Sequence, residues 1–203
     1  GHRYAYISPW LAREASANKY PVVPPMIYLE RHSDNLRKEN NIPDTATVFA
    51  RMGGEDTWNL PFANYVIEET LKNRKDCWFI FMNTPAFIEH PRVLFFPPNA
   101  DMYFKTKFIN TSDAMLHCRQ EGESFGSTIA EFSTLNKPVI TWFGSPERNH
   151  IESLGEKGIF YQSPQDLYNV LMHFKPMPNV DWNAYKDLTP ENVMRVFDKV
   201  FLH

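Results

Sequence analysis

Short, continuous apolar runs separated by helical stretches are the feature that most restricts the fold of this chain. Each of the six runs has four to six residues, and five of them are rich in valine, isoleucine, phenylalanine or tryptophan, while 114–118 is AMLHC. Apolar strands that alternate with helices are typical of a parallel sheet covered on both faces. The sequence therefore predicts an α/β fold, a Rossmann-like doubly wound parallel sheet, with strands over 47–52, 77–82, 93–97, 114–118, 139–142 and 159–162.

The helical stretches between the runs carry start and stop signals. Asp101 and Ser163 stand where an N-cap is expected, and Pro164 follows at a first helical position. Asn136-Lys137-Pro138 is a stop signal for the helix before it. The pattern predicts helices over 61–74, 102–111, 127–135 and 163–174.

The two ends of the chain fit the sheet less well. Residues 4–8 and 9–16 predict one further strand and helix, and three prolines make 20–29 an extended connector. Residues 175–190 predict a crossover to a final amphipathic helix over 191–201. The expected division is 1–41, a remnant or extension of another domain; 42–175, the sheet domain; and 176–203, the crossover and C-terminal helix.

Charge and composition exclude several classes of function. The net charge of −3 gives no basic footprint for nucleic acid. The sequence has no run of about eighteen apolar residues, so no membrane-spanning segment is predicted. No signal peptide is recognised either, so a cytoplasmic location is expected. Cys77 and Cys118 each lie in an apolar run, which favours buried thiols of a reducing compartment over a disulfide.

Glycine-containing polar loops follow the first and the fourth apolar runs. In an open parallel sheet, ligands bind outside the carboxyl ends of the strands. A helix that begins near Ser127 would point its free amides and positive dipole end into the same crevice. The Arg51 guanidinium would add a planar fork for phosphate oxygens, while Gly53 and Gly54 would allow close backbone approach. The sequence thus predicts an anion site.

Two carboxylates flank the predicted helix start. Glu131 shares a helix face with Ser127 and Thr128, and a carboxylate that accepts two hydrogen bonds suits the vicinal diol of a ribose. Glu123 would lie beyond the phosphates, where a second sugar would stand. A nucleotide sugar has its parts in this order: ribose, diphosphate, hexose. Thr128 and Glu131 also fit a capping box, in which Glu131 only satisfies the backbone, and the residues alone allow both interpretations.

The spacing of Glu123 and Glu131 resembles the Glu-x7-Glu motif of GT-B glycosyltransferases. The segment FINTSDAMLHCRQEGESFGSTIAEFSTLNKPVIT (108–141) is similar to the donor-binding half of the retaining, group 1 branch, and a looser similarity runs from 42 to 174. The resemblance implies transfer of a hexose or deoxyhexose from a UDP-sugar to a hydroxyl of an oligosaccharide or glycan acceptor, without a metal. It also implies a separate N-terminal domain that supplies the acceptor site.

The resemblance assigns roles to residues. Glu131 would hold the ribose hydroxyls, Glu123 would contact the donor hexose, and Arg51 would grip the diphosphate. The 124–128 amides would meet the phosphates or the hexose, and the 97–99 loop would frame the base through its backbone. The residues expected to bind the donor are therefore Arg51, Gly53, Gly54, Asn99, Lys105, Arg119, Glu123, Ser124, Phe125, Gly126, Ser127, Thr128 and Glu131.

The chain departs from the family pattern after Arg51. The family often has a lysine there, whereas this chain has GEDTW, so Lys105 or Lys107 would have to substitute. The catalytic residues expected are Arg51, Glu123 and Asp56. Asp56 or the adjacent Glu55 would be the base if the reaction inverts the anomeric carbon. No metal ligand is expected, because no Asp-x-Asp pair and no zinc-like His/Cys spacing occurs.

Three single residues have alternative interpretations. Arg119 is balanced between a phosphate contact and a salt bridge to Glu121 or Glu123. His117 lies within an apolar run and is interpreted as a core histidine rather than a catalyst. His150 opens a helical stretch and is expected to cap it or face solvent.

Other functions and sources compete with the main hypothesis. A non-catalytic nucleotide-sugar-binding module of a larger protein would fit the short N-terminal part. A dinucleotide oxidoreductase would need Gly-x-Gly-x-x-Gly after the first strand, and RMGGEDTW (51–58) lacks it. The short layout also resembles the middle domain of a chlorovirus multi-domain glycosyltransferase, which implies UDP-L-rhamnose as donor and the host cytoplasm as location.

Overall fold

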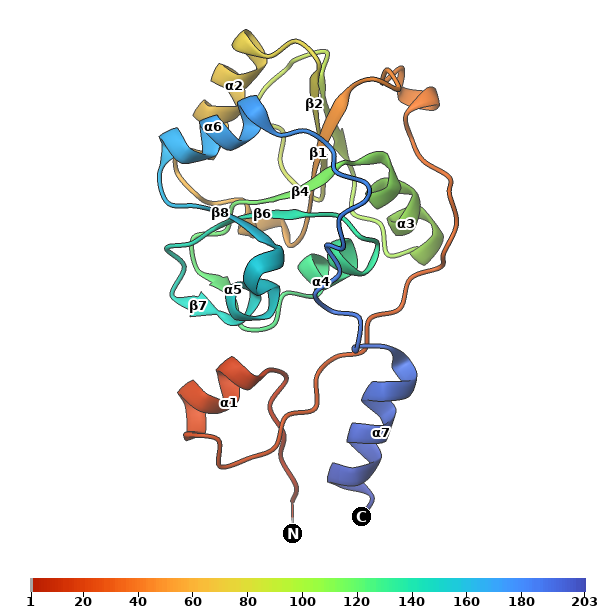
Figure 1. Ribbon diagram of the computed structural model, residues 1–203, viewed down its shortest axis with the longest axis vertical. Helices are drawn as coiled ribbons and strands as arrows, with labels where there is room; N and C mark the ends of the chain where they lie inside the picture. The colour runs from red at the N-terminus through yellow and green to blue at the C-terminus, as the bar shows by residue number, and fades with distance from the viewer. Residues whose placement is uncertain (1) are drawn as a thin grey trace.

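The computed structural model describes residues 2–203 and has a six-stranded parallel sheet at its centre (Figure 1). The strand order β3-β2-β1-β4-β6-β8 confirms the doubly wound arrangement, and each of the six strands predicted for the sheet is present to within one residue. A separate parallel pair, β5 with β7, lies beside the sheet domain. The strands are β1 (Thr47–Met52), β2 (Cys77–Met82), β3 (Val93–Phe96), β4 (Ala114–His117), β5 (Gly122–Glu123), β6 (Val139–Trp142), β7 (Glu147–Arg148) and β8 (Gly158–Tyr161).

Helices cover both faces of the sheet. On one face, α2 and α6 pack against Phe49 and Phe79; on the other, α3 and α4 pack against Val48 and Ile80. Alternate residues of a strand point to opposite faces, so a strand buried on both is apolar throughout. The helices are α1 (Pro9–Ser16), α2 (Ala63–Asn73), α3 (Met102–Thr111), α4 (Ser127–Thr134), α5 (Asn149–Leu154), α6 (Pro164–His173) and α7 (Pro190–Phe201), with short 3-10 turns η1 (Lys38–Asn40), η2 (Glu55–Thr57) and η3 (Gly155–Lys157).

The predicted N-caps are confirmed. The Asp101 carboxylate accepts a hydrogen bond from the Phe104 N–H at 2.7 Å, and the Ser163 hydroxyl accepts one from the Asp166 N–H at 3.0 Å. Pro164 occupies the first turn of α6, as expected. Cys77 and Cys118 are buried free thiols, also as predicted.

The N-terminal and C-terminal helices project from the same side of the sheet domain (Figure 1). Arg3 Nη1 donates to the Val200 carbonyl at 3.1 Å, so the two ends of the chain lie side by side. The strand predicted over 4–8 is reduced to a single parallel bridge between Tyr6 and Val22. Pro21 beside this bridge has no N–H to donate, which limits any longer ladder.

The connector and the crossover also join the sheet domain. The Ile27 N–H donates to the Leu188 carbonyl at 2.8 Å, and Leu29 and Tyr185 are buried in the core cluster that contains α4. No helix within residues 2–203 has the length and apolarity needed to cross a membrane.

Candidate functional site

A cavity of about 310 Å³ lies at the carboxyl ends of β1 and β4. The chain leaves these adjacent strands toward opposite halves of the sheet, and such a switch point is where α/β proteins bind ligands. The cavity therefore stands where the sequence placed the crevice. Its lining includes Arg51 near the end of β1, Gly53, Gly54 and Thr57 after it, His117, Arg119 and Glu123 at the end of β4 or after it, the residues Ser124 to Thr128, and Ile7 from the N-terminal segment.

The first turn of α4 opens into this cavity without a side-chain cap. Gly126 is the N-cap, with φ +90°, a conformation that favours glycine. Because the first amides of a helix have no intrahelical acceptor, the N–H groups of Ser127 and Thr128 remain available to a ligand. The turn before them is held in place: Ser8 donates through its hydroxyl to the Ser124 carbonyl, and Asn149 Nδ2 donates to the Phe125 carbonyl at 3.0 Å.

Glu123 lines the cavity with both carboxylate oxygens engaged. His117 Nε2 is 3.2 Å from Oε1, and Arg119 Nη1 donates to Oε2 at 3.0 Å. Burial acts to raise the pKa of Glu123, but the hydrogen bonds from His117 and Arg119, with the charge of Arg119, outweigh burial and leave this pKa below its usual value. Arg119 also approaches Glu121 at 3.8 Å, so both salt bridges considered for it are present.

Arg51 is buried at the cavity wall, and its terminal nitrogens bind protein acceptors. Nη1 donates to the Asn83 carbonyl and the Thr84 hydroxyl, and Nη2 donates to the Gly54 carbonyl and the Thr57 hydroxyl. Burial lowers its pKa to about 10, which still leaves it charged at neutral pH. The guanidinium therefore braces the loops after β1 and β2 and supplies positive charge, rather than presenting a free fork.

Glu131 and Lys105 lie outside the cavity lining and form an ion pair between α4 and α3. Lys105 Nζ donates to Glu131 Oε1, whereas Oε2 is buried without a hydrogen-bond partner. Burial raises the pKa of Glu131 despite this pairing. The capping-box interpretation is wrong, because no side chain caps α4. Lys107 turns to Glu39 instead, at 2.7 Å.

Besides Lys105 and Glu131, three further predicted site residues stand apart from the cavity. Glu55 and Asp56 are exposed in η2, and neither lines the cavity. Asn99 is exposed as well, and its side chain accepts a hydrogen bond from the Asp101 N–H at 2.8 Å. The structure therefore brings together the glycine loop, Arg119, Glu123 and the 124–128 turn, but not these three residues.

Two histidines near Glu123 differ from their sequence interpretations. His117 is buried, as a core histidine would be, but it also lines the cavity and contacts Glu123. The expectation for His150 is wrong: the side chain is completely buried, with its ring centroid 5.2 Å from that of His117. His150 lies in the first turn of α5, but β5 and β7 pair beside this helix and cover that turn. That pairing of two-residue strands leaves no periodic signal in the sequence.

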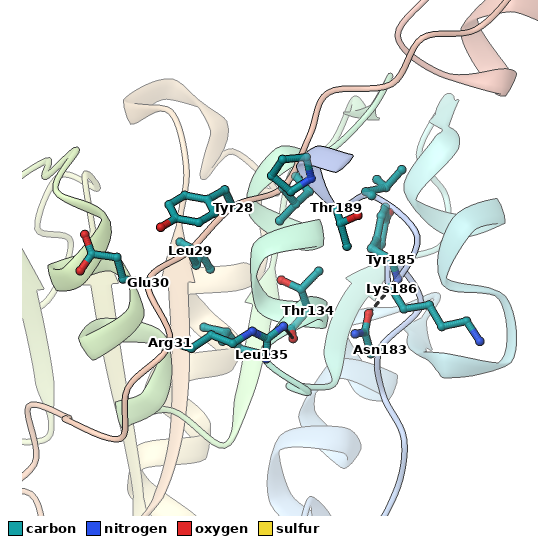
Figure 2. Close-up of a pocket in the computed structure, with 13 residues that line it drawn as sticks. Tyr28, Leu29, Glu30, Arg31, Thr134, Leu135, Asn183, Tyr185, Lys186 and Thr189 are labelled. Carbon is teal, nitrogen blue, oxygen red and sulfur yellow. Dashed lines mark hydrogen bonds between the residues drawn. The ribbon is translucent and has the colours of Figure 1, made fainter. Parts of the chain in front are cut away.

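A second cavity of about 350 Å³ lies between the connector, the last turn of α4 and the crossover (Figure 2). Figure 2 shows Arg31 reaching toward Thr134, and Arg31 Nη2 donates to the Thr134 carbonyl at 3.4 Å. This end of α4 presents carbonyl oxygens and the negative end of the helix dipole. A phosphate-bearing ligand is therefore favoured in the first cavity, at the opposite end of α4.

The parallel sheet and its helices match the GT-B Rossmann-like fold of solved glycosyltransferases. The structure of WaaG, a glycosyltransferase of lipopolysaccharide biosynthesis, matches with a TM-score of 0.64 and 17% identity over 91% of this chain. Anabaena HepE in complex with UDP-glucose matches with a TM-score of 0.61 and 17% identity over 91%. A glycosyltransferase from Rickettsia africae matches with a TM-score of 0.63 and 14% identity over 98%.

These likenesses extend over only part of the solved proteins. The chain spans 57% of the WaaG chain, 54% of the HepE chain and 59% of the Rickettsia africae chain. No protein-family model and no curated protein matches the sequence. At this level of identity the comparisons establish the fold, and the activity has to be argued from the site.

Proposed function

We propose that this chain binds a UDP-sugar in the cavity between β1, β4 and α4 and takes part in glycosyl transfer to a carbohydrate hydroxyl. The observation that carries the proposal is the uncapped α4 start, with Glu123 beside it. Amides and the helix dipole bind a diphosphate, and a carboxylate binds sugar hydroxyls. HepE, whose fold this chain shares, was solved with UDP-glucose, which supports the choice of donor class.

The chemistry needs stabilisation of the leaving diphosphate. The bond between the anomeric carbon and the β-phosphate oxygen breaks, and the acceptor oxygen forms the new bond to that carbon. The amides of Ser127 and Thr128 and the positive charges of Arg51 and Arg119 lower the energy of the departing anion. In a retaining reaction the acceptor proton passes to the leaving phosphate oxygen, so no basic side chain is required.

The ribose contact is assigned to Glu131. Its Oε2 is a buried acceptor without a partner, and a ribose hydroxyl would satisfy it. Glu123 is assigned to the hexose or deoxyhexose, for which L-rhamnose is our specific choice. We further infer a cytoplasmic location and an acceptor site on another domain of the same polypeptide. Asp56 and Glu55, which are exposed, are retained only as candidate bases for an inverting reaction.

A non-catalytic sugar-nucleotide module is the second candidate. The chain spans only 54–59% of three similar glycosyltransferase structures, which favours a partner domain for the acceptor. Donor hydrolysis or transfer by this chain alone would reject the module. A separate experiment tests Glu55 and Asp56 as bases. If NMR of the product shows inversion at the anomeric carbon and a variant without both carboxylates keeps its activity, neither residue is the base.

A thermal-shift screen tests the donor class. UDP and UDP-sugars are expected to raise the melting temperature, with a stabilisation that grows as the logarithm of one plus ligand concentration over Kd, while NAD and ATP leave it unchanged. A shift with NAD or ATP but not with UDP-sugars would overturn the proposal. Metal independence is tested in the same assay: EDTA is expected to leave the UDP-dependent shift unaltered, and a shift that requires added Mg²⁺ would contradict it.

A further inference from the structure

Three side chains from neighbouring strands form a hydrogen-bonded row that ends at the cavity. The Thr141 hydroxyl lies 2.8 Å from His117 Nδ1, and His117 Nε2 lies 3.2 Å from Glu123 Oε1. His117 and Thr141 face each other in register on β4 and β6, and both side chains are buried. Of the three, His117 and Glu123 line the cavity, whereas Thr141 stands behind them.

The positions of the protons follow from what each group can donate. An ionised Glu123 only accepts hydrogen bonds, so the His117 nitrogen that faces it, Nε2, carries the proton. In the neutral imidazole Nδ1 is then an acceptor. With His117 neutral, the Thr141 hydroxyl therefore donates to Nδ1, and this bond favours the Nε2–H tautomer.

Glu123 is fixed from its other sides as well. Arg119 Nη1 holds Oε2, and Gly122, with φ +79°, allows the backbone to approach so closely that a Cβ there would lie 2.1 Å from the Glu147 carbonyl oxygen. Each carboxylate oxygen can accept two hydrogen bonds and has one donor from the protein. One acceptor position on each oxygen therefore remains for ligand hydroxyls.

The neighbouring His150 does not add to the charge around His117. His150 of α5 packs beside His117, and burial lowers the His150 pKa to about 3, so His150 adds no positive charge at neutral pH. The charged groups near the His117 and Glu123 pair are thus Glu123 itself, Arg119 and Arg51, which lines the same cavity. The hydrogen bonds of this row fix the orientation of the Glu123 carboxylate relative to the cavity.

We infer that Thr141 and His117 are positioning residues that orient Glu123 toward the sugar of the donor. This inference rests on the proposed binding of a UDP-sugar in the cavity. Thr141 touches no ligand; it acts through the tautomer of His117. The row should therefore affect the affinity for the sugar part of the donor and not the affinity for UDP, because the 124–128 amides bind the phosphates independently of this row.

Thr141→Val and Thr141→Ser form a matched pair for the test. Valine has nearly the shape of threonine but lacks the hydroxyl, whereas serine keeps the hydroxyl and loses only a methyl group. Kd values are measured by calorimetry for UDP and for a panel of UDP-glucose, UDP-galactose, UDP-N-acetylglucosamine and UDP-L-rhamnose. Ring ¹⁵N spectra of His117, assigned by their absence in His117→Phe, report its tautomer in each variant.

We expect Thr141→Val to lose the Nε2–H tautomer signature and to bind the UDP-sugar about three- to tenfold more weakly, the effect of one hydrogen bond. UDP affinity should stay unchanged, and Thr141→Ser should match the original chain in both readouts. His117→Phe removes the row by a second route and should show the same sugar-selective loss, so the result does not depend on the folding of one variant.

Two results overturn the inference in distinguishable ways. If the original chain binds a UDP-sugar and Thr141→Val binds that sugar equally well, Thr141 does not act on Glu123, although the proposed function stands. If the original chain binds no UDP-sugar in the panel, the proposed function fails and the positioning role fails with it. An equal loss of UDP and UDP-sugar affinity would likewise show a general structural effect and contradict the selective role.

Discussion

Lys105 pairs with one oxygen of Glu131 and leaves the other, Oε2, buried without a hydrogen-bond partner. A buried polar atom without a partner costs about 1–3 kcal/mol, so natural proteins rarely retain one without a use. The Lys105 charge allows the carboxylate to remain in the interior, and the unpaired oxygen is the acceptor that we assign to a ribose hydroxyl of the proposed donor. Four predictions follow from this and related features of the site.

The first prediction concerns the ribose. Glu131→Gln should weaken UDP binding about ten- to hundredfold, because a hydrogen bond to a charged group contributes about 1.5–3 kcal/mol. The variant should also lose most of the preference for UDP over 2′-deoxy-UDP, measured by calorimetry. Glu156→Gln, at an exposed position, is the control. An unchanged preference in Glu131→Gln would mean that this carboxylate does not contact the ribose.

The second prediction separates bracing from direct phosphate contact at Arg51. Lysine cannot reproduce the two-pronged donation to the Thr84 and Thr57 hydroxyls and nearby carbonyls. Arg51→Lys should therefore lower the free energy of unfolding by about 2–4 kcal/mol without ligand, as expected for breaking a buried hydrogen-bonded charge. Urea denaturation measures this, with the exposed Arg195→Lys as control. Loss of UDP affinity at unchanged stability would contradict the brace.

The third prediction compares two glycines with positive φ. A Cβ at Gly122 would lie 2.1 Å from the Glu147 carbonyl oxygen, whereas a Cβ at Gly155 would meet nothing within 4 Å. Gly155→Ala should cost about 1 kcal/mol from backbone strain alone. Gly122→Ala should cost clearly more and also weaken UDP-sugar binding, because the backbone next to Glu123 must shift. Equal losses in urea denaturation would show that the β5–β7 pairing adjusts freely.

The fourth prediction is a loss of stability on acidification. The His150 pKa is about 3 in the folded chain and 6.5 as an ordinary value, so between these values the unfolded state binds more protons. Stability should then fall as pH drops from 6.5 to 5, by at most about 1.4 kcal/mol per pH unit from this one proton. The raised pKa of Glu131 acts in the opposite direction, so the comparison must be between variants.

His150→Leu provides that comparison. Urea denaturation at pH 7, 6 and 5 should show a shallower decline for His150→Leu than for the original chain, because the leucine side chain binds no proton. His173→Gln, an exposed position on α6, is the matched control. Parallel declines in all three proteins would show that His150 reaches solvent and protonates without unfolding.

The sequence predicted most of the fold because the signals were local. The strands of the main sheet were recognised from continuous apolar runs, and caps such as Asp101 and Ser163 mark helix starts through contacts three residues away. The isolated Tyr6–Val22 bridge was overestimated as a strand, since propensity does not report whether a partner strand is available.

The site was predictable in its location but not in its contacts. The glycine loop, Glu123 and the 124–128 turn could be placed together because they follow adjacent strands of a parallel sheet. The hydrogen bonds of Arg51, the Lys105–Glu131 ion pair and the burial of His150 all depend on residues that are far apart in sequence. Nothing in the spacing of those residues encodes such contacts.

By itself, the sequence determined the strand and helix pattern, the crevice and the acidic pair beside a helix start, because periodicity and capping are properties of neighbouring residues. Only the tertiary structure decided which donors engage the oxygens of each acid, which acceptors bind each arginine and which histidine faces the cavity. Those outcomes depend on burial and on donors supplied by other strands and helices, and both arise only when the chain has packed.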